Sequence, residues 1–356
     1  MAAELSLMIS VNGGNIVWVQ DAFGDFLGFF NAGCFLACSL SSQALQIILF
    51  TDYIKNIGVL LPLPVVWAIR VSFVLICTVA NTWGVKWFSR LSWVILVIVF
   101  LPFLLQMYLT YFQSVPVAPL ERLIDIPPFG EVSWGTLIST SVWALGGFDA
   151  VGAIAGEVTP KTFILGVLGA FPLCFFNYLL PIFASYLVSS YWQNWATGYF
   201  PLILKMFFPH AQWLSVFMVV AASIANFAQL TTSMSSVSWT IWAMGKGRKN
   251  QIALHRYLPY FVSWSWIRSK SGTERPIFAI LINSVLSLLV SILNFSFVVN
   301  MYLLVRIANL VCEYAALIRL KQRDPERKRP FAIPGGVPGA LLLSAPSLAI
   351  AVLALE

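Results

Sequence analysis

Long apolar runs are the feature that most constrains this chain. They recur along all 356 residues, of which 59% are hydrophobic, and short basic segments separate them. Only 10% of the residues are charged, against about 25% in soluble domains. So few charges could not cover the surface of a soluble protein of this length. The composition therefore excludes an ordinary soluble enzyme, a disordered protein and a nucleic-acid-binding module, and predicts an all-α membrane protein.

The lengths of the apolar runs predict how often the chain crosses the bilayer. A helical span needs about 20 apolar residues, so we expect one partial span at 1–10 and nine full spans in a single membrane domain over 1–356. Residues 11–24 and the Pro-rich segment 114–133 are expected to be loops, and 194–210 an interfacial stretch. The full spans are expected at 25–50, 64–83, 91–113, 134–156, 163–190, 211–243, 276–295, 298–319 and 337–355.

The distribution of basic residues predicts the orientation. If segment 246–275 is cytoplasmic, then 84–90, 157–162 and 319–329 lie on the same side. These four segments hold sixteen Lys and Arg residues, and the opposite side holds three. Cytoplasmic loops carry such an excess of positive charge, so we expect a multi-pass protein whose main basic loops are cytoplasmic. We expect the plasma membrane, with an organelle membrane as the alternative.

Neither the cysteines nor the histidines suggest enzyme or metal chemistry. The five cysteines lie in apolar stretches without a CxxC pair, so we expect free thiols, no metal, no cofactor and no disulfide-linked partner. An intramembrane hydrolase would need paired acids or a buried His. The two histidines, His210 and His255, lie at or outside the ends of the predicted spans, so we expect no enzyme.

The predicted span 134–156 breaks the rules for membrane helices most clearly, because glycines and an acid lie within it. Paired glycines weaken a helix by about 1 kcal/mol each relative to Ala. A helix broken at membrane depth frees backbone groups for a ligand and is tolerated where it lines a cavity. We therefore expect a break at Gly146-Gly147, whereas Gly152 and Gly156 have the spacing of packing glycines. The residues expected to bind substrate here are Trp143, Ala144, Leu145, Gly146, Gly147, Phe148 and Asp149.

Other polar residues inside the predicted spans are further candidates, because such residues are costly in lipid. Asp149 could hold an amine, carry a coupled proton or cap the second half-helix. Arg306 and Glu313 are seven residues apart on one helix, so each is expected to find a partner on a neighbouring helix. A fourth residue, Glu157, lies at the expected cytoplasmic end of its span. The candidates for coupling or gating are therefore Asp149, Glu157, Arg306 and Glu313. Asn226 and Ser233, on the polar span 211–243, are candidates for lining the substrate path.

The run from Phe148-Asp149 to Gly156-Glu157-Val158 combines an acid, glycines and a second acid within one span. It resembles the sixth helix of the amino acid–polyamine–organocation (APC) superfamily of permeases, most closely its polyamine-uptake and L-amino-acid-transporter-like branch. The run from Arg329-Pro330-Phe331 to Gly336 is similar to the segment after the tenth helix. Further matches, in the order of the family, are Ala3-Glu4-Leu5-Ser6, Asn12-Gly13-Gly14, Met234-Ser235-Ser236, Leu258-Pro259 and Glu313.

The resemblance implies an inverted-repeat helical bundle like that of the leucine transporter, with substrate held between broken helices. By this comparison 1–113 resembles helices two to five, 134–319 helices six to ten and 337–355 helix eleven. The first and last helices are then expected to be absent, and the bundle incomplete.

The implied function is secondary active transport of amino acids or polyamines by alternating access, coupled to protons. The partners are then a small-molecule substrate, a proton and the lipid bilayer. Arg306 stands where the family has a neutral residue, and its charge would repel a polyamine. A truncated, non-transporting remnant and an amino acid exchanger are the alternatives.

Overall fold

The computed structural model describes residues 1–9, 13–55, 61–83, 85–112, 128–157, 159–189, 195, 198–246, 267–268 and 274–353. Helices make up nearly all of these residues, which confirms the all-α class predicted from the sequence. The chain folds into two compact units. Unit 1 comprises Met1–Gln43, Ser133–Ala170 and Ser233–Glu356, and unit 2 comprises Ala44–Val132 and Phe171–Thr232.

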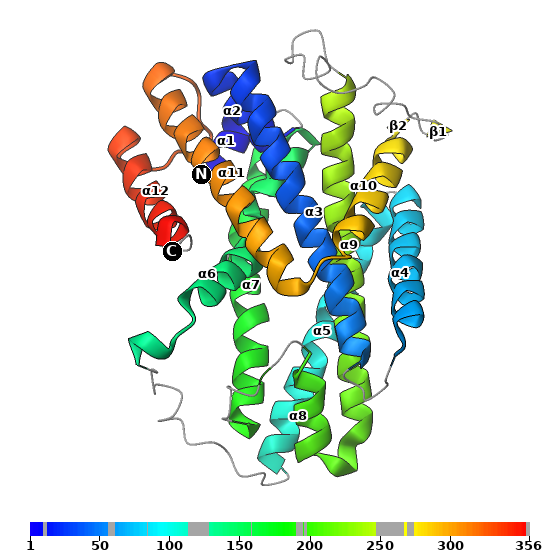
Figure 1. Cartoon of the computed structure of the whole chain (residues 1–356). Coiled ribbons are helices and arrows are strands. Elements are labelled where there is room, and N and C mark those ends of the chain that lie inside the picture. Colours follow the sequence, from blue (N-terminus) through cyan, green and yellow to red (C-terminus); the bar gives the residue numbers. More distant parts are fainter. Residues whose placement is uncertain are drawn as a thin grey trace. The chain divides into compact units, whose positions relative to one another are not determined.

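The elements follow one another along the chain as coloured in Figure 1. Three helices, α3 (Asp25–Lys55), α7 (Pro160–Val188) and α9 (Gln212–Lys246), have residues in both units. Unit 1 also contains α1 (Ala2–Met8), α2 (Asn15–Phe23), α6 (Trp134–Leu145), the 3-10 helix η3 (Phe148–Glu157), β1 (Ile267–Arg268), β2 (Glu274–Arg275), α10 (Ile277–Val290), α11 (Phe295–Arg323) and α12 (Gly336–Leu353). Unit 2 also contains α4 (Leu63–Trp83), α5 (Val85–Phe112), η2 (Phe129–Glu131), α8 (Phe200–Phe207) and η5 (Pro209–Ala211).

Six helices in the described part of the chain are long and apolar enough to cross a membrane. They contain the spans Asp25–Lys55, Leu63–Trp83, Arg90–Phe112, Pro160–Val188, Pro209–Trp242 and Phe295–Arg323. Two further apolar helices, α10 and α12, are shorter. The length and composition of the six long helices are those of a multi-pass membrane protein.

The helix α2 lies where the sequence predicts only a loop. Gly14 before it and Gly24 after it have positive φ angles of 56° and 90°, which glycine adopts without steric cost. Because these two residues turn the chain at both ends, a short helix fits between them. The helix buries Ile16, Trp18 and Val19, so tertiary packing stabilises a segment too short to cross a bilayer.

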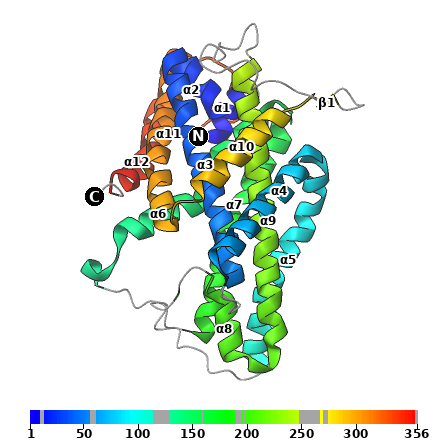
Figure 2. The same ribbon diagram turned by 45° about the vertical axis from the view of Figure 1, so that its right-hand side comes forward.

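Within unit 1, α11 is the element around which the others pack. It contacts α2, α6 and α12, while α1 and α2 contact η3. Figures 1 and 2 both show α1 and α2 at one end of α11. Side chains from α1, α2 and α11, among them Leu5, Trp18 and Leu317, form an apolar core there.

Gly152 allows η3 to approach α1 and α2 closely. A Cβ atom at this position would lie 2.5 Å from Cζ2 of Trp18 and 3.1 Å from Oγ of Ser6. The packing role predicted for Gly152 is thereby confirmed. The surroundings of Gly156 are not described.

Unit 2 has an apolar core of its own. Large side chains from α8 and α9, including Leu204, Leu214 and Met218, are almost completely buried in it. Polar groups in this unit bond to nearby backbone, as when Gln106 Nε2 donates to the carbonyl of Ala184 at 3.0 Å. These contacts hold α5 against α7.

Candidate functional site

The helix predicted over 134–156 is interrupted where the sequence indicates. The helix α6 ends at Leu145, and the 3-10 helix η3 begins at Phe148. Between them Gly147 has a φ of +97°, a conformation that favours glycine. The Ala150 amide donates to the carbonyl of Gly147 at 3.1 Å. The predicted break is confirmed.

Asp149, in the first turn of η3, forms a buried ion pair with Arg306 of α11. Their exposed fractions are 3% and 5%. Nη1 of Arg306 donates to Oδ2 of Asp149 at 2.9 Å, and Nη2 donates to Oδ1. This two-pronged geometry is the strongest that a guanidinium and a carboxylate can form. The expectation that Arg306 finds its partner on a neighbouring element is confirmed.

Three asparagines connect the ion pair to its surroundings. Asn309 accepts from Nη1 of Arg306 and donates to Oδ1 of Asn31 at 2.9 Å. Asn31 then donates to the backbone carbonyl of Asn15 at 3.2 Å. The residues so joined, with Glu313, form what we call the central network: Asn15, Asn31, Asp149, Arg306, Asn309 and Glu313.

Glu313 is the second acid of the central network and is completely buried. The amide of Asn15 donates to Oε1 of Glu313 at 2.8 Å and to Oδ2 of Asp149 at 3.4 Å. Oε2 of Glu313 has no hydrogen-bond donor among the described residues. The network thus contains two acids and one cation, and the cation is paired with Asp149.

Aromatic side chains lie around the helix break. The Trp143 indole N–H donates to Oγ of Ser42 at 3.2 Å, and its ring meets Phe295 edge to face at 6.2 Å. A Cβ atom on Gly146 would lie 2.9 Å from the Tyr302 hydroxyl. Phe148 is half-buried. The break is therefore bordered by rings from α6 and α11.

The other predicted site residues are placed as follows. Ala144 is half-buried, Leu145 is 55% exposed, and Gly146 and Gly147 are exposed. Ser233, in unit 1, accepts a hydrogen bond from Gln43 at 3.3 Å and does not bond to the central network.

Two predicted residues remain, and the structure describes the side chain of one of them. Asn226 lies in unit 2, where its amide donates to the Ala222 carbonyl of its own helix at 2.9 Å. The side chain of Glu157 lies outside the described residues.

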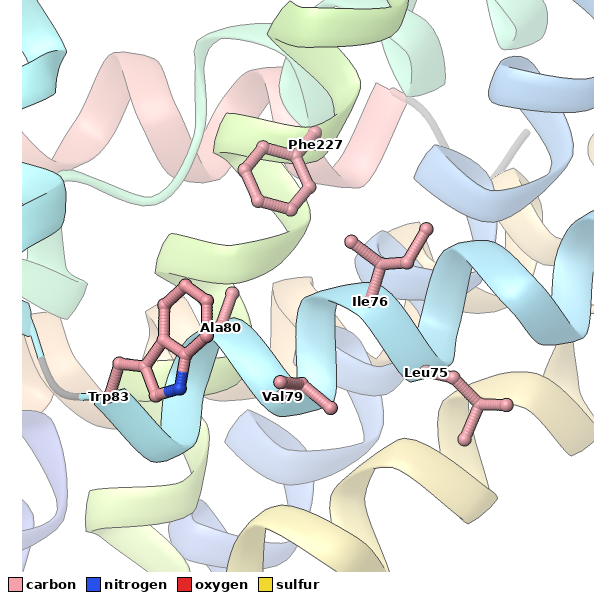
Figure 3. A pocket seen from close by; sticks show the side chains of 6 residues that line it. All are labelled: Leu75, Ile76, Val79, Ala80, Trp83 and Phe227. Carbon is pink, nitrogen blue, oxygen red and sulfur yellow. The ribbon is translucent and has the colours of Figure 1, made fainter.

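An apolar groove of about 320 Å³ lies in unit 2 (Figure 3). Side chains of α4 and one residue of α9 line it, and the Trp83 indole carries the one nitrogen among them. This lining holds no charged side chain. The lining residues are Leu75, Ile76, Val79, Ala80, Trp83 and Phe227.

The three asparagines of the central network were not found by sequence reasoning. Asn31 and Asn309 lie within long apolar runs, where an isolated amide is a costly residue, and this cost was the available signal. Asn15 follows a pair of glycines in the segment expected to be a loop, so nothing in the sequence placed it beside an acid.

A multi-pass helical membrane protein with a broken helix and a buried ion pair beside the break belongs to the class of membrane transporters. Comparison with known sequences is consistent with this class. The amino acid permease family matches residues 1–355, so the chain belongs to that family, within the APC superfamily. The family consists of permeases, in agreement with the expectation that the chain is not an enzyme.

Several plant proteins are similar to the chain over nearly its whole length. Two probable polyamine transporters of Arabidopsis thaliana are 27% and 29% identical to it, covering 98% and 97% of this chain and 69% and 67% of their own length. The polyamine transporter RMV1 of Arabidopsis thaliana is 28% identical over 97% of this chain and 68% of its own length.

Proposed function

We propose that this transporter moves amino acids or polyamines across the plasma membrane by alternating access, coupled to protons. The observation that carries the proposal is the helix break at Gly146-Gly147 with the Asp149–Arg306 ion pair beside it. The names of its plant relatives support a polyamine substrate, and the family description supports an amino acid.

The helix break provides a binding site for an amine in this proposal. The C-terminal end of a helix carries a partial negative charge because its last carbonyls lack donors. The end of α6 falls at Leu145, next to Asp149 in the first turn of η3. An ammonium group, which amino acids and polyamines share, is the chemistry that these carbonyls and this carboxylate would recognise.

Arg306 decides which of the two substrate classes fits better. Both Asp149 oxygens are bound by this guanidinium, so a substrate amine has to compete with Arg306 for Asp149. A zwitterionic amino acid can satisfy both partners, its amine binding Asp149 and its carboxylate binding Arg306. A polyamine satisfies Asp149 alone and leaves Arg306 as a buried, unpaired charge, which is costly.

The remaining predicted residues have supporting roles in the proposal. Trp143 or Phe148 covers the bound substrate, and Asn226 and Ser233 line its path. Glu157, Arg306 and Glu313 act with Asp149 in gating or coupling. The basic loops are cytoplasmic, and the segments 1–113, 134–319 and 337–355 correspond to family helices two to five, six to ten and eleven.

Uptake of radiolabelled leucine, arginine, putrescine and spermidine into cells without their own carriers tests the proposal. We expect saturable uptake of one class, lost in Asp149→Asn and kept in Glu131→Gln, a matched change at an exposed acid of η2. Uptake of polyamines but not amino acids would contradict the argument from Arg306. No uptake of any substrate by correctly inserted protein would support the non-transporting alternative.

A further inference from the structure

The two acids of the central network differ in the hydrogen-bond and ion-pair partners of their carboxyl oxygens. Asp149 has both oxygens bound by the guanidinium of Arg306. Glu313, equally buried, has one oxygen on the neutral amide of Asn15 and the other without a donor among the described residues. No ion pair joins Glu313 to a Lys or Arg in the part of the chain that the structure describes.

The charged and titratable groups that act on Glu313 do not supply the missing countercharge. Two of them are cations, but Arg306 is already paired with Asp149, and the Met1 amino group forms no ion pair with Glu313 among the described contacts. The remaining groups are an acid, a phenol and two thiols. Among the described residues, these groups include Asp149 on η3, Arg306, Tyr302 and Cys312 on α11, Cys38 on α3 and the Met1 amino group.

An uncompensated carboxylate inside a membrane protein is unfavourable, because it loses its hydration without gaining a cation. A proton removes that charge without needing space. The contact between the two acids leads to the same conclusion. The Asn15 amide donates to both carboxyls, at 2.8 Å to Glu313 and at 3.4 Å to Asp149, which places the two acids next to each other. Two carboxyl groups in contact can hydrogen-bond only when one of them carries a proton.

We propose that Glu313 carries the coupled proton and that Asp149, held by Arg306, stays ionised throughout. The proposal rests on the proposed transport function for its coupling role. The protonated Glu313 carboxyl donates toward Asp149 when the site is closed, and it releases its proton to water when the site opens. The sequence leaves four candidates for coupling or gating, and the contacts select one of them as the proton carrier.

Infrared difference spectroscopy of the full chain in liposomes tests the proton site without requiring transport. The carbonyl stretch of a protonated carboxyl is followed while the pH is raised. We expect this band in the wild-type protein and in Glu131→Gln, and its loss in Glu313→Gln. Persistence of the band in Glu313→Gln would overturn the assignment.

Uptake measured across a pH series tests the coupling role. Uptake that depends on one proton falls about tenfold per pH unit above its titration. We expect Glu313→Gln to exchange substrate at every pH without this dependence, and Glu313→Asp to keep the dependence with a displaced midpoint. An unchanged pH profile in Glu313→Gln would overturn the proposal. Where Glu313→Gln does not fold, as judged by size-exclusion chromatography, an unchanged midpoint in Glu313→Asp would do so.

The two measurements also separate this inference from the proposed function. If the wild-type protein takes up no substrate while the infrared band depends on Glu313, the proton site stands and the transport proposal fails. If uptake is proton-dependent while the band is independent of Glu313, transport stands and the inference fails.

Discussion

Two buried glutamates of unit 1 differ in whether cations compensate the charge of their carboxylates. Glu4 and Glu313 are both completely inaccessible to solvent. Oε1 of Glu4 lies 3.2 Å from Nζ of Lys321 and 3.2 Å from Nε of Arg329. Its Oε2 accepts the backbone N–H of Ile333 at 2.8 Å. Glu313, by contrast, receives one hydrogen bond from a neutral amide.

The comparison teaches that burial alone does not identify a functional acid. Glu4 joins α1 to the end of α11 and to the segment before α12, which is a structural role. Glu313 forms no ion pair among the described residues. A carboxylate buried there for structural reasons would lose its hydration without gaining a stabilising contact with a cation. The number of cations that face each acid is therefore the property that separates the two roles.

The largest effect is expected from Glu4→Gln. This change leaves Lys321 and Arg329 buried without their countercharge, and breaking a buried pair from one side costs about 4–5 kcal/mol. We expect a much lower melting temperature in detergent. Glu313→Gln is the matched control, because it makes the same substitution at a buried acid with no ion pair among the described residues. An equal loss of stability in both variants would break the comparison.

A smaller loss of stability is expected when one member of the Asp149–Arg306 ion pair is replaced. Either Asp149→Asn or Arg306→Gln leaves one buried charge unpaired, at a cost of about 3 kcal/mol.

The double change Asp149→Asn with Arg306→Gln removes both charges, so it should cost less than the sum of the two single changes while uptake stays abolished. Thermal melts of the three variants measure the coupling between the two residues. Simple additivity of the two single changes would show that the pair does not exist in the membrane.

An intermediate effect is expected at Gly152, where η3 packs against Ser6 of α1 and Trp18 of α2. In Gly152→Val the side chain would meet the Trp18 ring, and overpacking of this kind costs about 2 kcal/mol. Gly169→Ala in α7 is the control, because a Cβ atom there meets nothing within 4 Å. Melting temperatures that fall alike in both variants would contradict the close packing of η3 on α1 and α2.

The sequence predicts the helices and the break well, because both depend on local properties. Apolar length determines where α3, α4 and α11 lie, and paired glycines determine where α6 ends. The charge of Arg306 within an apolar run also indicates that a partner must exist.

The identity of the partners could not be predicted, because it depends on how distant elements pack. Asn15 reaches Glu313 across 298 positions of sequence, and Arg306 reaches Asp149 across 157. Arg306 and Glu313 look equivalent in the sequence as two charges on one helix. The tertiary contacts give Arg306 a countercharge, and among the described residues they give none to Glu313.

The smallest effect is expected at Asp21, an acid at the exposed end of α2. Burial acts to raise the pKa of this carboxyl, but hydrogen bonds from Arg323 and Arg327 outweigh it and hold the pKa below its ordinary value of 3.8. The stabilisation is therefore complete above the ordinary pKa and disappears as the pH falls through the lower value of the folded protein.

Because solvent screens these pairs, Asp21→Asn should cost less than about 1 kcal/mol at neutral pH. The melting temperatures of Asp21→Asn and the wild-type protein should converge under strongly acidic conditions, once the pH is below the lowered pKa of the carboxyl in the folded protein, as measured in detergent. The pH profile of uptake near neutrality should be the same in both, since Asp21 stays ionised there. A displaced uptake profile in Asp21→Asn would mean that a surface acid contributes to coupling, and it would remove the distinction drawn between compensated and uncompensated acids.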